Sequence, residues 1–220
     1  MTPAASYPRG FFDRADPTPD TSFYDQPRLV THIDAGAIAA VTALYAELGL
    51  DGSAPHPVRV LDLMSSWVSH LATPPAELVV LGLNQQELDA NPMATERVVQ
   101  DLNADPSLPF GDAEFDAVLC CVSIDYLTRP VEVLAEAARV LRPGAPVVIT
   151  FSTGASRPRP STAGWPPTTP DAQPSSPATC ETPAASTSRS CPSVRRGAAI
   201  AVIRCTPWWR AQSPPEQHMS

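Results

Sequence analysis

The segment VRVLDLMSSWVSHL, residues 58–71, places groups that can bind a polar ligand directly after an apolar run. Asp62 supplies a carboxylate at the end of the run, and Ser65 and Ser66 supply two hydroxyls. Small side chains let a ligand approach the backbone, whose N–H groups in such a loop can bind an anionic group. The alternative is that Asp62 caps the next turn and that the two serines cap a short helix.

The same loop lacks glycine, and this narrows the class of ligand. Nicotinamide-dependent reductases carry G-x-G-x-x-G after the first strand, because glycines bring the backbone close to the pyrophosphate. Met64, Ser66 and Val68 stand where such glycines are expected. A reductase of this class is therefore disfavoured. We expect the bulky Met64 and Trp67 to turn into the core or to wall a pocket.

Short apolar strands alternate with helices along the chain. The predicted strands are 58–64, 77–83, 96–102, 115–123 and 145–151, and the predicted helices are 34–50, about 66–71, one from near 85, and 129–144. Asp34 is the expected N-cap of the first helix, and Gly49 its stop. This alternation predicts an α/β fold with a doubly wound, mostly parallel sheet. Ligands of such sheets bind beyond the carboxyl ends of the strands.

The length of 220 residues fits one domain with a substantial core. We divide it into an irregular segment over 1–30, an α/β body over 31–152, and a tail over 153–220. The first segment is rich in proline, and its aromatic residues are expected to anchor it to the body. These residues are Phe11, Phe12, Phe23 and Tyr24.

The body is acidic, with 8 arginines against 20 aspartates and glutamates over residues 1–152 and no lysine. This charge disfavours nucleic acid as a partner, because phosphate contacts need basic residues. No apolar run suits a membrane span or a secretory leader, so a cytoplasmic location is expected. The cysteines show no metal-binding spacing, and no metal site is expected. Cys120 and Cys121 lie in an apolar strand and are predicted to be buried, inert thiols.

Three stretches of the chain carry a family pattern: VLDLMSSWVSHL, VVQDLNADPSLPFGDAEFDAVLCCVSIDYLTRP and VLAEAARVLRPGAPVVITF. They resemble the class I S-adenosylmethionine (SAM)-dependent methyltransferases of the type 11 methyltransferase-domain kind. The middle stretch is the most specific, because LPFGD-x-x-FDAV followed by a strand and L-RPG recurs in that group. The resemblance covers about residues 58–151, and a subset of methyltransferase-like proteins also has SSWVSH in place of the glycine loop. It implies a Rossmann-like methyltransferase sheet and SAM as cofactor.

The resemblance also implies a donor-binding site. Asp62 matches an acidic position of the family, and Asn84 stands where the family has an acid that accepts hydrogen bonds from the ribose hydroxyls. A neutral amide accepts more weakly than a carboxylate. Residues 101–103 fall where the family contacts adenine, and Ser123 follows the fourth strand and would face the donor. The predicted donor-binding residues are Asp62, Ser65, Ser66, Asn84, Asp101, Leu102, Asn103 and Ser123.

No catalytic residue is predicted, because methyl transfer from a sulfonium needs chiefly an aligned nucleophile. His32 and His70 lie on apolar-rich segments and are predicted to be structural, and Tyr126 faces the donor or packs in the core. The predicted function is SAM-dependent methyl transfer to an unknown small-molecule acceptor. The alternative is a non-catalytic methyltransferase-like protein that binds a small molecule or a partner protein. The missing glycines and Asn84 favour this alternative. The sequence leaves the oligomeric state open.

The composition changes abruptly at Thr153. Residues 153–220 hold 12 prolines, 18 serines and threonines, and no leucine. One interpretation is a natural, disordered extension of low complexity. We favour a shift of the reading frame near the codons for Ser152 and Thr153. With either origin, the tail is expected to be largely disordered and to supply no substitute for the final strands, which leaves the fifth strand as an exposed edge.

Two stretches support the frame shift when they are read one base back. TGASRPR (153–159) can be recoded as NRCFPTK, which resembles the segment after the fifth strand in the SSWVSH subset. IRCTPWWR (203–210) can be recoded as DPLYAVVAR, whose apolar residues alternate as in a strand. One part is independent of codon choice. Every Cys and Trp codon begins with the bases TG. When the frame is moved one base back, these two bases end the preceding codon, and any codon that ends in TG encodes Leu, Met or Val. This applies at Cys205, Trp208 and Trp209.

Sequencing of the source DNA across the codons for Phe151 to Arg159 tests the frame shift. We expect an extra base there that restores NRCFPTK, because one lost base accounts for both recoded stretches. If the printed frame is confirmed at high coverage, the tail is natural. Loss of methyl transfer then becomes the favoured interpretation.

Overall fold

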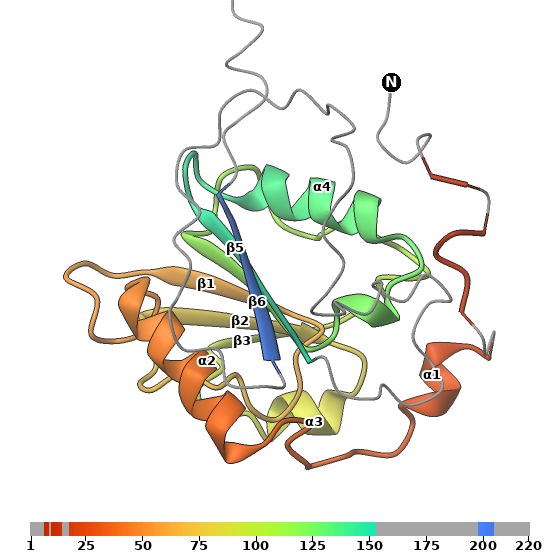
Figure 1. Ribbon diagram of the computed structural model, residues 1–220, viewed down its shortest axis with the longest axis horizontal. Helices are drawn as coiled ribbons and strands as arrows, with labels where there is room; N and C mark the ends of the chain where they lie inside the picture. The colour runs from red at the N-terminus through yellow and green to blue at the C-terminus, as the bar shows by residue number, and fades with distance from the viewer. Residues whose placement is uncertain (1–6, 9, 15–17, 153–197, 205–220) are drawn as a thin grey trace, which may run out of the picture.

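The computed structural model describes residues 7–8, 10–14, 18–152 and 198–204 (Figure 1). Six strands form one sheet in the order β3-β2-β1-β4-β5-β6. The strands are β1 (Arg59–Leu63), β2 (Glu77–Gly82), β3 (Glu96–Val99), β4 (Ala117–Cys121), β5 (Pro146–Ser152) and β6 (Ala198–Arg204). The helices are α1 (Asp20–Phe23), α2 (Ala35–Glu47), α3 (Gln85–Asp89) and α4 (Pro130–Val140), and Ile124–Tyr126 form a short 3-10 helix.

The sheet is doubly wound, as the sequence predicts. Strands β1 to β5 pair in parallel, and the strand order reverses between β1 and β4. In open parallel sheets, the crevice at such a reversal is the usual ligand site. The loops that follow β1, β2, β3 and β4 therefore define the place to look for function.

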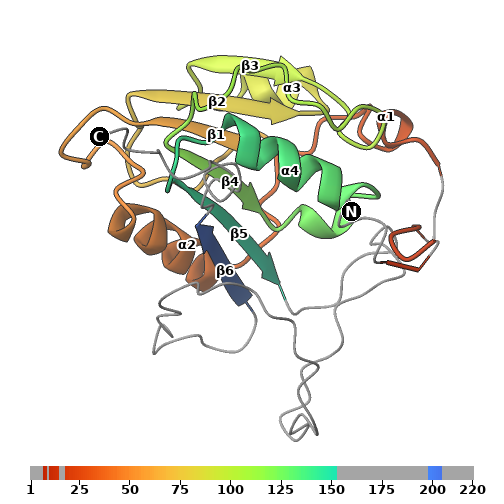
Figure 2. The same ribbon diagram turned by 90° about the horizontal axis from the view of Figure 1, so that it is seen from above.

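Helices α2 and α4 cover opposite faces of the sheet, as Figures 1 and 2 show. Successive strand residues point to opposite faces, so Leu61 packs in the cluster that contains Val133 of α4, and Val60 packs in the cluster that contains Val41 of α2. The central strands are buried on both faces, which explains why their sequences are apolar throughout.

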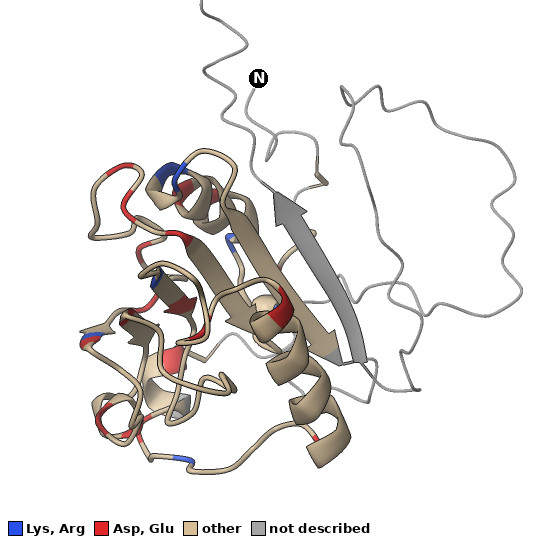
Figure 3. Ribbon diagram, turned by 90° about the vertical axis from the view of Figure 1, so that its left-hand side faces the viewer, with Lys and Arg blue, Asp and Glu red and all other residues tan. Residues whose placement is uncertain are grey.

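The start of α2 is capped as predicted, because Asp34 Oδ1 accepts a hydrogen bond from Ala37 N at 2.8 Å. The helix has one charged residue, Glu47, and Figure 3 shows it nearly free of charge colours. The helix ends at Glu47, two residues before the predicted stop at Gly49. Gly49 has a φ of +66°, which glycine adopts at helix ends without steric cost.

Two predicted elements differ from the structure. The third strand ends at Val99 rather than at residue 102, because Asp101 Oδ1 accepts from Asn103 N at 2.9 Å and turns the chain. The predicted short helix over 66–71 is absent, and the segment runs without regular structure from Met64 to Ala76. We call this segment after β1, residues 64–76, the first loop. Its contacts with β2 and α3, described below, replace the hydrogen bonds of that helix.

The expectation that the printed tail supplies no strand beside β5 is wrong. Residues 198–204 form β6, which pairs antiparallel with β5 from Ser152–Ala198 to Pro146–Arg204. Along these residues β5 is therefore not an exposed edge. The remainder of the tail, 153–197 and 205–220, lies outside the described residues, as does the prediction of disorder made for it.

One of the four aromatic residues expected to anchor the first segment does not pack in the core. Phe11 is exposed and packs against Tyr7 and Phe12 rather than in the core. Over the described ranges, no helix is long and apolar enough to cross a membrane. No group of three metal-ligating side chains is found among those same residues.

Candidate active site

The carboxyl ends of β1 to β4 bring most of the predicted donor-binding residues to one edge of the sheet. Asp62 lies in β1, Ser65 and Ser66 follow it, Asn84 follows β2, and residues 101–103 follow β3. Ser123 follows β4, where its hydroxyl donates to Cys121 O at 2.8 Å. Leu102 is buried in the core, so its side chain packs there.

Asp62 is a buried carboxyl that organises the first loop. Its Oδ2 accepts a hydrogen bond from Ser65 Oγ at 2.7 Å. Burial raises the pKa of Asp62 to about 6, although hydrogen bonds from Ser69 and Ser65 act in the opposite direction. Asp62 therefore holds the turn, and its role towards a methyl donor stays a prediction.

The backbone of the first loop is hydrogen-bonded to the end of β2. Ser65 N donates to Leu81 O at 2.8 Å, which continues the pairing of β1 with β2 past the end of β1. Met64 adopts a φ of +54°, a left-handed conformation that directs the chain onto β2. The expected helix N-terminus in this loop is therefore not formed. The serines bind carboxylates within the protein instead of capping a helix.

Gly82, the last residue of β2, allows this close contact. A Cβ atom at this position would lie 2.3 Å from Ser65 O. No side chain fits there, so the last residue of β2 cannot carry a carboxylate while the loop is in place. The sequence interpretation did not single out Gly82.

Asn84 caps α3 and binds the N-terminal segment at the same time. Its Oδ1 accepts from Glu87 N at 3.1 Å. Its Nδ2 donates to Tyr24 O at 2.8 Å and to Asp25 O at 3.3 Å. Both ends of this amide therefore already have partners within the chain.

Glu87 is a functional candidate that the sequence interpretation missed. It is 7% exposed, and its carboxylate lies between the first loop and the N-terminal segment. Oε2 accepts from Ser66 Oγ at 2.6 Å, and Oε1 accepts from Arg28 N at 2.6 Å. The spacing Asn84-x-x-Glu87 resembles a capping box, which marks the start of a helix but does not indicate the partners that the carboxylate has here.

The turn after β3 holds Asn103 in a fixed orientation. Asn103 Nδ2 donates to Asp20 Oδ2 at 2.8 Å and to Tyr126 O at 3.0 Å, and Oδ1 accepts from Thr128 N at 2.7 Å. This amide therefore joins the loop after β4 to α1. The backbone oxygen of Tyr126 takes part, which places that residue at the site edge.

Cys120 is buried, and Cys121 and His70 are partly buried. Burial raises the pKa of Cys120 far above its ordinary value and that of Cys121 to about 11, so both thiols stay protonated near neutral pH. Burial also lowers the pKa of His70, which favours its neutral form. These directions agree with the prediction of inert thiols and a structural histidine.

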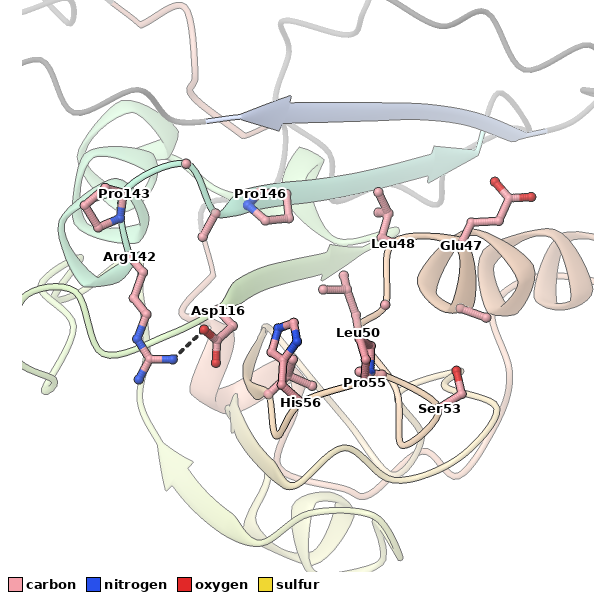
Figure 4. A pocket seen from close by; sticks show the side chains of 16 residues that line it. Glu47, Leu48, Leu50, Ser53, Pro55, His56, Asp116, Arg142, Pro143 and Pro146 are labelled. Atoms are coloured by element: carbon pink, nitrogen blue, oxygen red, sulfur yellow. Dashed lines mark hydrogen bonds and ion pairs between the residues drawn. The ribbon is translucent and has the colours of Figure 1, made fainter.

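A cavity of about 610 Å³ lies at the opposite edge of the sheet, by the amino ends of the strands. Figure 4 shows His56, Leu50 and Pro146 around it, with an ion pair between Arg142 and Asp116 on its wall. No predicted donor-binding residue lines this cavity. It is thus separate from the site at the strand reversal.

Residues 64–149 match a family model described as a methyltransferase domain. The matched segment is similar to that family over less than half of the chain. The match confirms the resemblance predicted from the sequence, and it spans the loops after β1, β2, β3 and β4. A search of curated proteins gave no match.

The chain is also similar to solved structures. One is an S-adenosylmethionine-dependent methyltransferase from Mesorhizobium loti, at 17% identity and a TM-score of 0.41 over 52% of each chain. A second is the cyclase SpnF, at 21% identity and 0.44 over 60% of this chain and 54% of that one. A third is a protein from Pyrococcus horikoshii, at 21% identity and 0.41 over 60% and 66%. The chain spans about half the length of the first structures that it matches.

In the described conformation, the groups that the resemblance assigns to SAM are bound within the chain. The amides of Asn84, which stands at the position of the family's acid, and of Asn103 both bind residues of the N-terminal segment. The hydroxyls of Ser65 and Ser66 both donate to carboxylates of the protein. The chain itself thus satisfies the polar groups that the resemblance assigns to the donor.

Proposed function

We propose that the methyltransferase domain binds SAM at the carboxyl ends of its parallel strands and transfers a methyl group to a small-molecule acceptor. The observation that carries this proposal is the family match over 64–149, which includes every loop at the strand reversal. The buried Asp62 and the turn at Asp101 stand at the positions that the resemblance assigns to the donor. The acidic body supports a small molecule rather than a nucleic acid as the acceptor, and a cytoplasmic location belongs to the same proposal.

Each residue has a role that follows from its contacts. Asp62 fixes the first loop through Ser65, and Asp101 fixes the following turn through the N–H groups of Asn103 and Ala104. Asn103, so oriented, presents amide groups beside that turn. Binding of the donor then requires the N-terminal segment to release Asn84 and Asn103. A non-catalytic, ligand-binding protein is the alternative, and the bonded state of these amides supports it.

Calorimetric titration of the full chain with SAM tests the proposal. We expect saturable binding with a Kd below about 100 μM, which corresponds to roughly 5.5 kcal/mol. Asp101→Asn should weaken binding about tenfold or more, since an amide accepts the turn's N–H bonds less strongly. Asp105→Asn is the matched control, because Asp105 is an exposed acid in the same loop. Absence of heat with SAM and with its demethylated product would remove the enzyme interpretation and leave the alternative.

A further inference from the structure

Residues 20–30, here called the N-terminal strap, bind across the predicted donor site. The strap's bonds reach three of the loops that form the site. Asp20 accepts from Asn103, Tyr24 and Asp25 accept from Asn84, and Arg28 N donates to Glu87. Val30 O accepts from Trp67 Nε1 at 3.1 Å. In Figure 2, the chain between α1 and α2 passes the ends of the strands to which the arrows point.

The chemical groups of the strap are those that a polar ligand would offer. A carboxylate and backbone carbonyls accept from the amides of Asn103 and Asn84, and one N–H donates to the Glu87 carboxylate. A buried polar group without a partner costs roughly 1–3 kcal/mol. The strap therefore stabilises the domain when no ligand is bound, and these same groups would be available to a ligand if the strap moved away.

The strap is attached mainly by polar contacts. Its only helix, α1, has four residues, and two of its apolar side chains, Leu29 and Val30, are 56% and 54% exposed. A segment with few buried apolar contacts opens at a low free-energy cost compared with the core. Opening would expose Asn84, Glu87 and Asn103 without disturbing β1 to β4.

We propose that the N-terminal strap and the methyl donor compete for these groups, so that the protein holds its own donor site closed until the donor displaces the strap. This proposal rests on the proposed function. It makes Glu87 a donor-side carboxylate, whose Oε1 is occupied by Arg28 N in the closed state. The apparent Kd of the donor then equals its intrinsic Kd divided by the fraction of open molecules.

The pair Arg28→Pro and Arg28→Ala tests the competition in the full chain. Proline removes the N–H that binds Glu87, whereas alanine keeps it and removes the same side chain. The difference between the two variants thus reports the loss of this N–H donor together with the fixed backbone angle of proline. We expect SAM to bind Arg28→Pro about tenfold more tightly than Arg28→Ala, because a lost bond to a charged group raises the open fraction by about that factor. Asp20→Ala, which removes the acceptor of Asn103, is the second variant and should act in the same direction.

Hydrogen exchange supplies a readout that does not depend on methyl transfer. The backbone amides of residues 20–30 should exchange faster when SAM is bound to the wild-type protein. If all variants bound SAM with equal affinity and hydrogen exchange of residues 20–30 did not change, the proposed competition would be wrong. The proposed function would remain intact. Failure of every variant to bind SAM would overturn the proposed function, and the competition with it.

Discussion

Replacing Gly82 by alanine is expected to destabilise the protein by about 3 kcal/mol, the upper range for forced overpacking. The added methyl carbon would lie 2.3 Å from Ser65 O and 3.1 Å from Leu88 Cδ2. The first of these atoms belongs to the backbone and cannot rotate away. The loop must therefore leave the end of β2, and it loses the bond from Ser65 N to Leu81 O. Urea unfolding followed by circular dichroism measures the change.

Gly49→Ala is the matched control for this substitution. Gly49 has a φ of +66°, but no other atom lies within 4 Å of the position of its Cβ. The control should cost about 1–2 kcal/mol, the penalty of a left-handed conformation alone. If Gly82→Ala costs no more than Gly49→Ala, the tight contact between the loop and β2 is not maintained in solution.

The fold was predictable from the sequence because its signals are local. The apolar runs of β2 and β4 identify strands buried on both faces, and Pro130 with Pro143-Gly144 brackets α4. Asp34 likewise specifies its own cap within three residues. Each of these features depends on neighbours in the chain, so a single sequence is sufficient to find it.

The conformation of the candidate site was less predictable because its contacts are distant in sequence. Ser66 binds Glu87, 21 residues away, and Arg28 N binds the same carboxylate from 59 residues away. Neither periodicity nor spacing reports such pairs. The loop after β1 was thus placed correctly on the sheet but was given a helix that it does not form. The position of β6 was missed for the same reason, since its pairing with β5 joins residues on either side of a long segment.

The second large effect expected is a gain of stability when Asp62 is replaced by asparagine. Burial raises the pKa of Asp62 from its ordinary value of 3.8 to about 6. The folded state therefore binds the proton more tightly than the unfolded state. Proton binding to Asp62 therefore adds to the free energy of unfolding. This addition is about 3 kcal/mol, is complete below about pH 4 and is lost as the pH rises through about 6.

Asparagine carries no charge at any of these pH values, and its Oδ1 still accepts a hydrogen bond from Ser65. The Asp62→Asn variant should be more stable than the wild type by about 1–3 kcal/mol at pH 7.5 and of equal stability at pH 4. Thermal unfolding at both pH values measures the difference. Asp105→Asn is the control of opposite sign, because Ser107 lowers the pKa of Asp105, and its stabilising effect is lost as the pH falls. Equal stability of Asp62→Asn and wild type at pH 7.5 would show that the carboxylate is fully compensated by its serines. A gain would mean that the domain retains a destabilising buried charge beside its strand reversal, which is where strain and unfavourable burial are expected to serve function.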